Sequence, residues 1–467
     1  MGDELHGSLF KYYVYYKFIV VEKENNKKNI SIIFPILREE MEGYKDIDHI
    51  LPFLYFLSKS DAVEYTARGI IFENKANYLK KNIDQRIELL SNLKNVDLEF
   101  LYKDNFLVKI KQLLELKNNS KLAKLFNRLI NKFYIKLLKV RQKNFDISYN
   151  LGENFINSKL PLIITLHSNY RAQEIVSRIK KINKKAKWMI LPHGTTICDN
   201  IMVLDTDLDK DNIIKQHESY NKIDYFASTS KRDLENAIAG GLQSSKGSVI
   251  GSPRYCKEWL KVKSQFELDG KEVSINNEYK VKILFLIPKK HINIFSEELI
   301  RTIDFISSYQ EIELILLHYD FSFPKLPIRI ADRVNIRHYV ISKEYSTSKL
   351  IDWADIVFHV GTGVLFESFI KEKITVLPRY LTSNTLICDK YNAGYNLSNR
   401  DELRDFCNTA LTSINELKKQ YKEKCEYNNK KFIDDFVYAN TTSVSQNIIK
   451  TLSSINNKIN LLEKDSL

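Results

Sequence analysis

Two patterns of apolar and polar positions take turns along most of the chain. Short, nearly continuous apolar runs are separated by longer stretches whose apolar residues recur every three or four positions. The first pattern is typical of parallel strands buried on both faces, and the second of amphipathic helices. Predicted strands in the first half are 29–36, 95–102, 160–168, 187–194, 225–230 and 248–253. Those in the second half are 281–288, 312–320, 335–341, 354–360 and 374–380.

Helical patterns fill the spaces between these strands. The predicted helices are 49–58, 78–92, 170–183, 231–242, 296–309, 347–354 and 363–373, and residues 401–460 are helical and polar. The stretch 262–280 is polar without a clear period, so we expect it to link two domains. The strand–helix alternation on both sides predicts an α/β protein with two doubly wound domains that face a central cleft. Ligands of such sheets bind beyond the carboxyl ends of the strands.

The expected domains follow from this division. Residues 1–265 form an N-terminal, Rossmann-like acceptor domain that carries a basic helical insertion at 105–144. Residues 281–400 form a C-terminal, Rossmann-like nucleotide-binding domain. Residues 401–467 are expected to pack as helices on the outside.

Positive charge is concentrated in the insertion. The chain has a net charge of +13, and 105–144 hold eleven lysines or arginines and one glutamate. Apolar and basic residues there form two stripes at helical spacing. Two interpretations stay open, a helix with a solvated basic face and a helix that lies on anionic lipid headgroups. Nucleic acid is not an expected partner, because no helix-turn-helix, zinc finger or RNP-type motif accompanies the charge.

The compartment is predicted from what the sequence lacks. The N-terminus shows no basic segment followed by an apolar core, and no apolar run reaches the ~20 residues of a membrane-spanning helix. The five cysteines are scattered without a CxxC pair, which indicates a reducing compartment. We therefore expect a cytoplasmic protein, with the insertion as a means of peripheral attachment to the inner face of the membrane.

Histidines recur at the predicted strand ends. Four of the nine histidines have this setting, namely His167, His193, His318 and His359. A lone histidine at such a place is more often structural than catalytic, but several that converge on one cleft favour a chemical role. His193 lies in ILPHGTTICDN, between a buried strand and a turn rich in hydroxyl groups. An imidazole titrates near neutral pH, which suits a general base.

The segment HVGTGVLFESF, residues 359–369, is the second strong signal. Here a strand ends in Gly361-Thr362-Gly363 and a helix is expected to begin at once. Free backbone N–H groups make such a junction an anion site, and Thr362 is expected both to cap the helix and to donate to a phosphate. Glu367 is placed to accept hydrogen bonds from ribose hydroxyls. The alternative is a capped helix without a ligand, and neither GxGxxG nor GxxxxGK[ST] is present.

Three ordered motifs carry a resemblance to a known family. They are HGTT at 193–196, GSPR at 251–254, and ADIVFHVGTGVLFES at 354–368 followed by ITVLP. The sequence resembles the CDP-glycerol glycerophosphotransferase and bacterial capsule glycosyltransferase superfamily over about residues 160–385. That resemblance implies the GT-B fold, with two Rossmann-like domains. The sequence departs from the family in having Gly-Thr-Gly where a serine pair is usual, and Tyr319 where a proline follows the histidine.

The resemblance also implies roles for individual residues. His193 corresponds to the general base or to a contact of the reacting phosphate. The expected donor-binding residues are His318, Gly361, Thr362, Gly363, Glu367, Ser252 and Arg254. Ser252 is included for its place at a predicted strand end, and the same reason makes Asp199 a second catalytic candidate and His167 and Thr195 the expected acceptor-binding residues. Arg254 has an alternative, since it can also bind the acceptor or pair with a carboxylate inside the fold.

These assignments lead to one expected function and three alternatives. We expect a glycosyltransferase that moves a sugar from a nucleotide sugar onto a surface polysaccharide or a lipid-linked glycan. The alternatives are a CDP-activated polyol-phosphate transferase, a nucleotide-sugar 2-epimerase and a non-catalytic assembly or membrane-docking protein. No cofactor and no metal are expected, because the DTD at 205–207 falls in a polar loop and a helix N-terminus with basic side chains can stabilise the leaving group.

Overall fold

The structure is a computed structural model that describes most of the chain from residue 29 to residue 464. The described residues are 29–36, 45–61, 64–72, 89, 92–101, 155, 158, 160–166, 170–192, 220–266, 273, 278–287, 294–318, 326–340, 345–441 and 443–464. The predicted helix at 78–92 lies almost wholly outside them, and the basic insertion at 105–144 lies outside them entirely.

The N-terminal half is built on a parallel sheet. Among the described residues it has seven strands in the order β3-β2-β1-β4-β5-β6-β7. Their bounds are β1 Asn29–Ile36, β2 Glu64–Phe72, β3 Val96–Leu101, β4 Leu160–Thr165, β5 Lys187–Ile190, β6 Tyr225–Ser228 and β7 Gly247–Val249. The direction of winding reverses between β1 and β4, which pair in parallel. This reversal defines the edge at which doubly wound sheets bind ligands.

The C-terminal half repeats this plan. Its described residues form six parallel strands in the order β10-β9-β8-β11-β12-β13, with the reversal between β8 and β11. Their bounds are β8 Val281–Leu286, β9 Ile312–His318, β10 Ile336–Val340, β11 Ile356–His359, β12 Ile374–Pro378 and β13 Tyr395–Leu397. The order is that of a Rossmann-type sheet.

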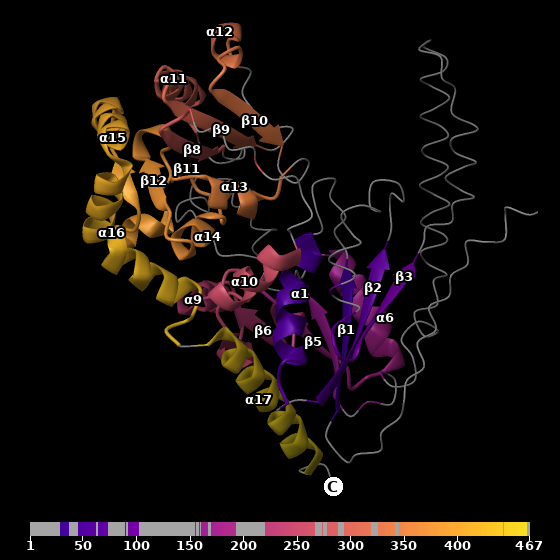
Figure 1. Cartoon of the computed structure of the whole chain (residues 1–467). Helices are drawn as coiled ribbons and strands as arrows, with labels where there is room; N and C mark the ends of the chain where they lie inside the picture. The colour runs from indigo at the N-terminus through magenta and orange to yellow at the C-terminus, as the bar shows by residue number, and fades with distance from the viewer. Residues whose placement is uncertain are drawn as a thin grey trace, which may run out of the picture.

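Helices cover both faces of each sheet (Figure 1). Those of the N-terminal half are α1 Lys45–Ser58, α6 Tyr170–Ile182, α9 Lys231–Ala239 and α10 Lys257–Phe266. Those of the C-terminal half are α11 Ser296–Ser307, α12 Ile328–Ala331, α13 Thr347–Trp353, α14 Leu365–Ile370, α15 Arg400–Thr412 and α16 Ile414–Phe436, and the last helix is α17 Val444–Lys464. Short 3-10 turns lie at Ser244–Lys246, Arg379–Leu381 and Ile387–Tyr391. No helix among the described residues is long and apolar enough to cross a membrane.

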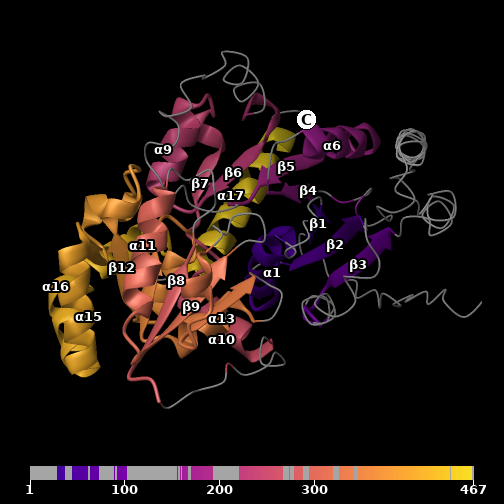
Figure 2. The ribbon, with the colours of Figure 1, turned by 90° about the horizontal axis from the view of Figure 1, so that it is seen from above.

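The last helices join the two halves. Figure 2 shows α15 and α16 beside the C-terminal sheet, on the side of β12. The next helix, α17, crosses to the N-terminal half and packs against α1. Its residues Val444, Ile448 and Leu452 are buried in the core of that half. The C-terminal segment is therefore helical, and its final helix belongs to the core of the first sheet.

Alternate residues of the central strands enter different cores. Ile32 and Phe34 of β1 pack on one face of the sheet, and Ile33 packs on the other. Phe285 of β8 and its neighbour Leu284 divide in the same way. A strand that is buried on both faces has no polar side, which explains its continuous apolar run. The prediction of an α/β fold with two Rossmann-like, doubly wound halves, the GT-B architecture, is confirmed by this topology.

The structure differs from the prediction in three local features, which are two additional strands and one boundary. Every predicted strand is present, but β2 and β13 were not predicted, because Arg68 and Gly69 interrupt the apolar run of β2 and β13 has only three residues. The expected linker 262–280 begins later, since α10 continues to Phe266. Its amphipathic residues pack against the N-terminal core, where Trp259 is buried and Val262 lies against it.

A glycine fixes the turn that follows β7. Gly251 has a φ of +83°, and a Cβ there would lie 2.4 Å from the carbonyl oxygen of Val437. We expect Gly251→Ala to lower the free energy of unfolding by at least about 2 kcal/mol, because it adds left-handed strain to a backbone collision. Thermal unfolding measures the effect. Gly240→Ala is the matched control, since Gly240 has a φ of −79° and the nearest atom to the added Cβ would be a Tyr220 ring carbon at 3.1 Å, with backbone oxygens no closer than 3.4 Å. Equal losses in both variants would contradict the argument.

Candidate functional site

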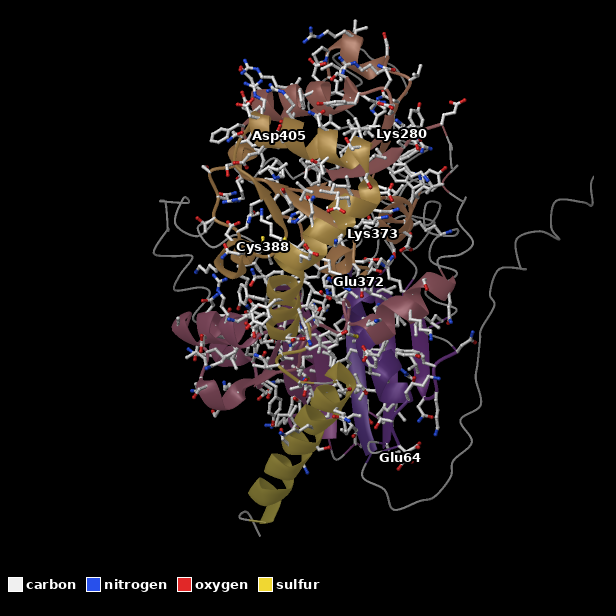
Figure 3. The ribbon with its side chains drawn as sticks, turned by 60° about the vertical axis from the view of Figure 1, so that its left-hand side comes forward. Glu64, Lys280, Glu372, Lys373, Cys388 and Asp405 are labelled. Carbon is white, nitrogen blue, oxygen red and sulfur yellow. The ribbon has the colours of Figure 1, made fainter. Side chains whose placement is uncertain are left out.

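The carboxyl ends of the two sheets meet. Tyr255, in the segment after β7, packs against Phe366 of α14, with ring centroids 5.5 Å apart. Eight residues further on, Lys263 Nζ of α10 lies 3.3 Å from Glu367 Oε2. Both contacts join a loop or helix that follows a strand of one sheet to the helix that follows β11 of the other. Figure 3 shows Cys388, which is buried in the same shared core, at the level where the two halves meet.

A pocket opens on the N-terminal side of this contact. Its empty volume is about 310 Å³, part of which is open to solvent. The lining residues come from the carboxyl ends of β5, β6 and β7 and from α1. They are His49, Leu191, Pro192, Thr229, Ser252, Pro253, Arg254 and Tyr255. The predicted donor-binding residues Ser252 and Arg254 therefore lie together, in a pocket made by the N-terminal half.

Arg254 is held in place by two aromatic rings. Its Nη1 lies 3.1 Å from Nε2 of His49, and its guanidinium carbon lies 5.2 Å from the centroid of the Tyr255 ring. A guanidinium can only donate, so His49 Nε2 accepts and the ring is neutral with its proton on Nδ1. The chain turn that carries Arg254 is also held in place, because the backbone N–H of Ser252 donates to Val437 O at 2.7 Å.

Sequence reasoning did not select His49. It is buried in α1, with 6% of its surface exposed, and comes from a segment that reads DIDHILPF. A histidine that precedes Ile50 and lies two residues after Ile47, on a helix, reads as a core residue. The one available signal was its position on the apolar face of a helix that follows a central strand. Its partner lies 205 residues later, so the pairing had no local signature.

Four predicted site residues lie outside the described residues: His167, His193, Thr195 and Asp199. The chain that leads to them is described. The backbone N–H of Leu191 donates to Thr165 O at 2.9 Å, so the segment after β5 remains attached to the sheet. Pro192 then lines the pocket. The roles of these four residues stay predictions.

The junction after β11 has the expected glycine turn but not the expected cap. Gly361 has a φ of +76°, a conformation that glycine adopts easily. Helix α14 begins at Leu365, and its N-cap is Val364, with no side-chain hydrogen bond. Thr362 is therefore not the N-cap, and within the described residues its Oγ1 accepts one long hydrogen bond, of 3.5 Å, from the N–H of Val364. The six residues of α14 give it a small dipole, so an anion here would depend chiefly on the backbone and hydroxyl of 361–363.

Glu367 is engaged by the protein itself. Its side chain is 3% exposed, Lys263 and Lys371 lie at 3.3 and 3.1 Å, and the Ser348 hydroxyl donates to it. Burial acts to raise the pKa of Glu367, but the two lysine charges and the hydrogen bonds outweigh it and lower the pKa to about 2. Both carboxylate oxygens therefore have partners. Ribose binding by Glu367 stays a prediction, and it would require one of these partners to be exchanged.

The other two strand-end histidines differ in their surroundings. His318 ends β9 and is buried, and its ring centroid lies 6.4 Å from that of His338 on β10. His359 ends β11 and is fully buried, and within the described part of the chain neither of its ring nitrogens has a hydrogen-bond partner. Burial, followed by the charge of Arg379, lowers the pKa of His359 to about 3. His359 is thus neutral at physiological pH.

Metal binding has no support from the described side chains. Among them, no three His, Cys, Asp or Glu residues are grouped so that they could hold an ion. Several of the candidate residues lie outside the described ranges, so metal-independent chemistry stays a prediction.

The chain was compared with known proteins. No protein-family profile and no curated protein matches it. Solved structures with a similar fold include HepE from Anabaena in complex with UDP-glucose, at 12% identity and a TM-score of 0.47 over 91% of this chain and 100% of that one. The UDP-GlcNAc 2-epimerase from Neisseria meningitidis gives 13% and 0.49 over 91% and 100%. The wall teichoic acid polymerase TagF gives 14% and 0.48 over 94% and 92%. Similarity at this level does not transfer an activity to this chain.

Proposed function

We propose that the chain is a glycosyltransferase that moves a sugar from a nucleotide-activated donor onto a glycan or lipid-linked acceptor. The observation that supports this most is the meeting of two Rossmann-type sheets at their carboxyl ends, through Tyr255–Phe366 and Lys263–Glu367. Each sheet brings polar strand-end residues to this edge. A transferase needs two ligands side by side, and two facing sheets supply one site each.

In this proposal the donor binds the C-terminal sheet. The backbone and hydroxyl of Gly361-Thr362-Gly363 would hold the donor phosphates, and His318 lies two strands away at the same edge. Fixed dipoles and nearby lysines would stabilise the negative charge that develops on the leaving nucleotide. His193 would take the proton of the acceptor hydroxyl, with Asp199 as the second catalytic candidate, and Thr195 and His167 would contact the acceptor.

The proposal also covers the cellular setting and the nearest alternative. We propose a cytoplasmic enzyme whose basic insertion at 105–144 attaches to anionic lipid. A CDP-activated polyol-phosphate transferase would use the same residues. The identity of the nucleotide that binds is therefore the first observation that distinguishes it from a glycosyltransferase. A 2-epimerase would convert a nucleotide sugar without an acceptor, and the basic insertion at 105–144 is unnecessary for that reaction.

Thermal unfolding with CMP, CDP, UDP, GDP and ADP, without added metal, tests the proposal. A ligand that binds only the folded protein raises the unfolding midpoint. At 100 times its Kd it adds about 2.7 kcal/mol to the free energy of unfolding. We expect one nucleotide to do so, and Thr362→Ala to weaken its binding about 10- to 100-fold through the lost hydrogen bond to a charged group. Thr412→Ala, at an exposed threonine of α15, is the control. Stabilisation by none of the five would favour a non-catalytic docking protein.

A further inference from the structure

Lysines are concentrated at the edge of the N-terminal sheet that lies opposite the carboxyl ends of its strands. Helix α6 ends at this edge with Ile182, and β5 begins there at Lys187. The segments 180–187 and 220–225 together hold six lysines and one acidic residue, Asp224, and so have a net charge of +5. We call these lysines the lysine patch, and they are Lys180, Lys181, Lys184, Lys185, Lys187 and Lys222.

Side-chain contacts bring the two segments together. Lys180 Nζ lies 2.7 Å from Asp224 Oδ2, and Lys222 Nζ donates to a glutamine side chain of α6 at 3.0 Å. A seventh lysine joins from a third segment, because Lys246 Nζ donates to the carbonyl oxygen of Asn221 at 3.2 Å. Lysines from three segments of the chain therefore share one face of the molecule.

The end of a helix explains only part of this charge. The C-terminal end of a helix carries a partial negative charge, which favours cations in the last turn, and Lys180 and Lys181 occupy the last turn of α6. This effect falls off beyond that turn, whereas Lys184 and Lys222 lie outside α6 and are exposed. Because neighbouring ammonium groups repel one another, an anionic partner would stabilise the patch.

The type of cation indicates what this partner is. The two segments contain lysines and no arginine. An ammonium is a point charge that suits a surface of many anionic groups, whereas the guanidinium fork suits a specific two-point contact with one of them. The patch therefore fits an extended anionic surface better than a single bound anion.

Two exposed aliphatic side chains lie at the same edge. Ile182 at the end of α6 and Ile238 in the last turn of α9 are each 37% exposed. Both helices pack on the same face of the sheet, since their residues share one core. Lysines around exposed aliphatic side chains are typical of surfaces that bind at the boundary between lipid headgroups and acyl chains.

We propose that the lysine patch binds the anionic headgroups of a membrane, with Ile182 entering the headgroup layer. This surface consists of other residues than the basic insertion at 105–144, and the inference does not depend on the proposed transferase activity. The patch lies at the opposite end of the strands from the contact between the two sheets. Binding through it would therefore leave that contact, and the polar strand-end residues beside it, facing away from the bilayer.

Co-sedimentation of the full chain with vesicles tests this proposal. Vesicles of phosphatidylcholine and phosphatidylglycerol in equal amounts are compared with vesicles of phosphatidylcholine alone. We expect wild type to bind the charged vesicles and not the neutral ones. Lys181→Gln/Lys184→Gln should bind the charged vesicles at least about tenfold more weakly, since each lysine near an anionic surface adds to the attraction. The matched control is Lys430→Gln/Lys431→Gln, which removes the same charge from exposed lysines of α16 and should bind within about twofold of wild type.

A second variant tests the apolar part of the surface. Ile182→Ser should weaken binding to the charged vesicles about threefold, because less apolar surface leaves water. Soluble polyphosphate is the second probe, since it offers negative charge without an apolar layer. Tight polyphosphate binding that depends on Lys181 and Lys184, with unchanged vesicle binding by Ile182→Ser, would identify a soluble polyanion as the partner and overturn the proposal.

Three other results would also overturn it. They are failure of wild type to bind charged vesicles, equal binding by wild type and Lys181→Gln/Lys184→Gln, and an equal loss in the α16 control. Unfolding midpoints show that each variant is folded, and they should match wild type because the replaced side chains are exposed. Nucleotide binding, which tests the transferase, is measured separately and should be the same in all variants.

Discussion

Replacing His193 by alanine is expected to lower kcat for sugar transfer about 10²- to 10⁴-fold, the usual contribution of a general base. The expectation combines the sequence motif around His193 with the described path of the chain that leads to it. The chain leaves β5, is tied to Thr165 O through the N–H of Leu191, and reaches the pocket at Pro192. The next residue is His193. The donor for this assay is a sugar linked to the nucleotide that stabilises the protein. The rate at which this nucleotide is released in the presence of acceptor measures the effect.

Two further variants make this result specific. His338→Ala replaces an exposed histidine of β10 and should leave kcat unchanged. His193→Gln keeps a hydrogen-bonding side chain without a base and should be as inactive as the alanine variant. Because the substitution should affect the chemical step, nucleotide affinity and the unfolding midpoint should match wild type. Unchanged turnover in His193→Ala would remove this residue from the mechanism and shift attention to His167 and Asp199.

The strands were predictable because each has a local signature. A strand buried on both faces has an apolar run whatever its neighbours are, so β8, β9 and β11 could be recognised from their own residues. Strand β2 shows the limit of this reasoning. Its register with β1 and β3 places Arg68 and Gly69 inside the sheet, and that pairing depends on segments far away in the sequence.

The site was predictable in position but not in partners. Polar residues after strand ends could be listed from the sequence, and the structure places Ser252 and Arg254 in one pocket. The pairing of Arg254 with His49, and of Glu367 with Lys263 104 residues earlier, depends on how helices of different segments pack. No local pattern encodes such contacts. For the same reason Glu367 looked open to a ribose, whereas in the fold it is enclosed by two lysines and a serine.

His359 gives the second large expected effect, a dependence of stability on pH. An unfolded histidine takes up a proton near pH 6.5, whereas in the folded chain burial and the Arg379 charge lower the pKa of His359 to about 3. Between about pH 3 and pH 6.5 the unfolded state therefore binds one proton more than the folded state, at His359. The free energy of unfolding must therefore fall as the pH falls from 6.5 towards 3, by about 1.4 kcal/mol per pH unit once inside this window.

The variant His359→Leu isolates this effect, because leucine fills a similar volume and cannot be protonated. We expect it to be at least as stable as wild type at pH 7.5, because it removes two buried nitrogens that have no hydrogen-bond partner among the described residues. Its advantage should grow by roughly 2 kcal/mol between pH 7.5 and pH 5. Glu367, whose pKa is lowered to about 2, loses its own stabilisation only below about pH 4.5, outside this range. Unfolding midpoints at pH 7.5, 6.5, 5.5 and 5.0 measure the difference, with the exposed His338→Gln as control. Parallel curves for His359→Leu and wild type would show that His359 is protonated in the folded protein or reached by water.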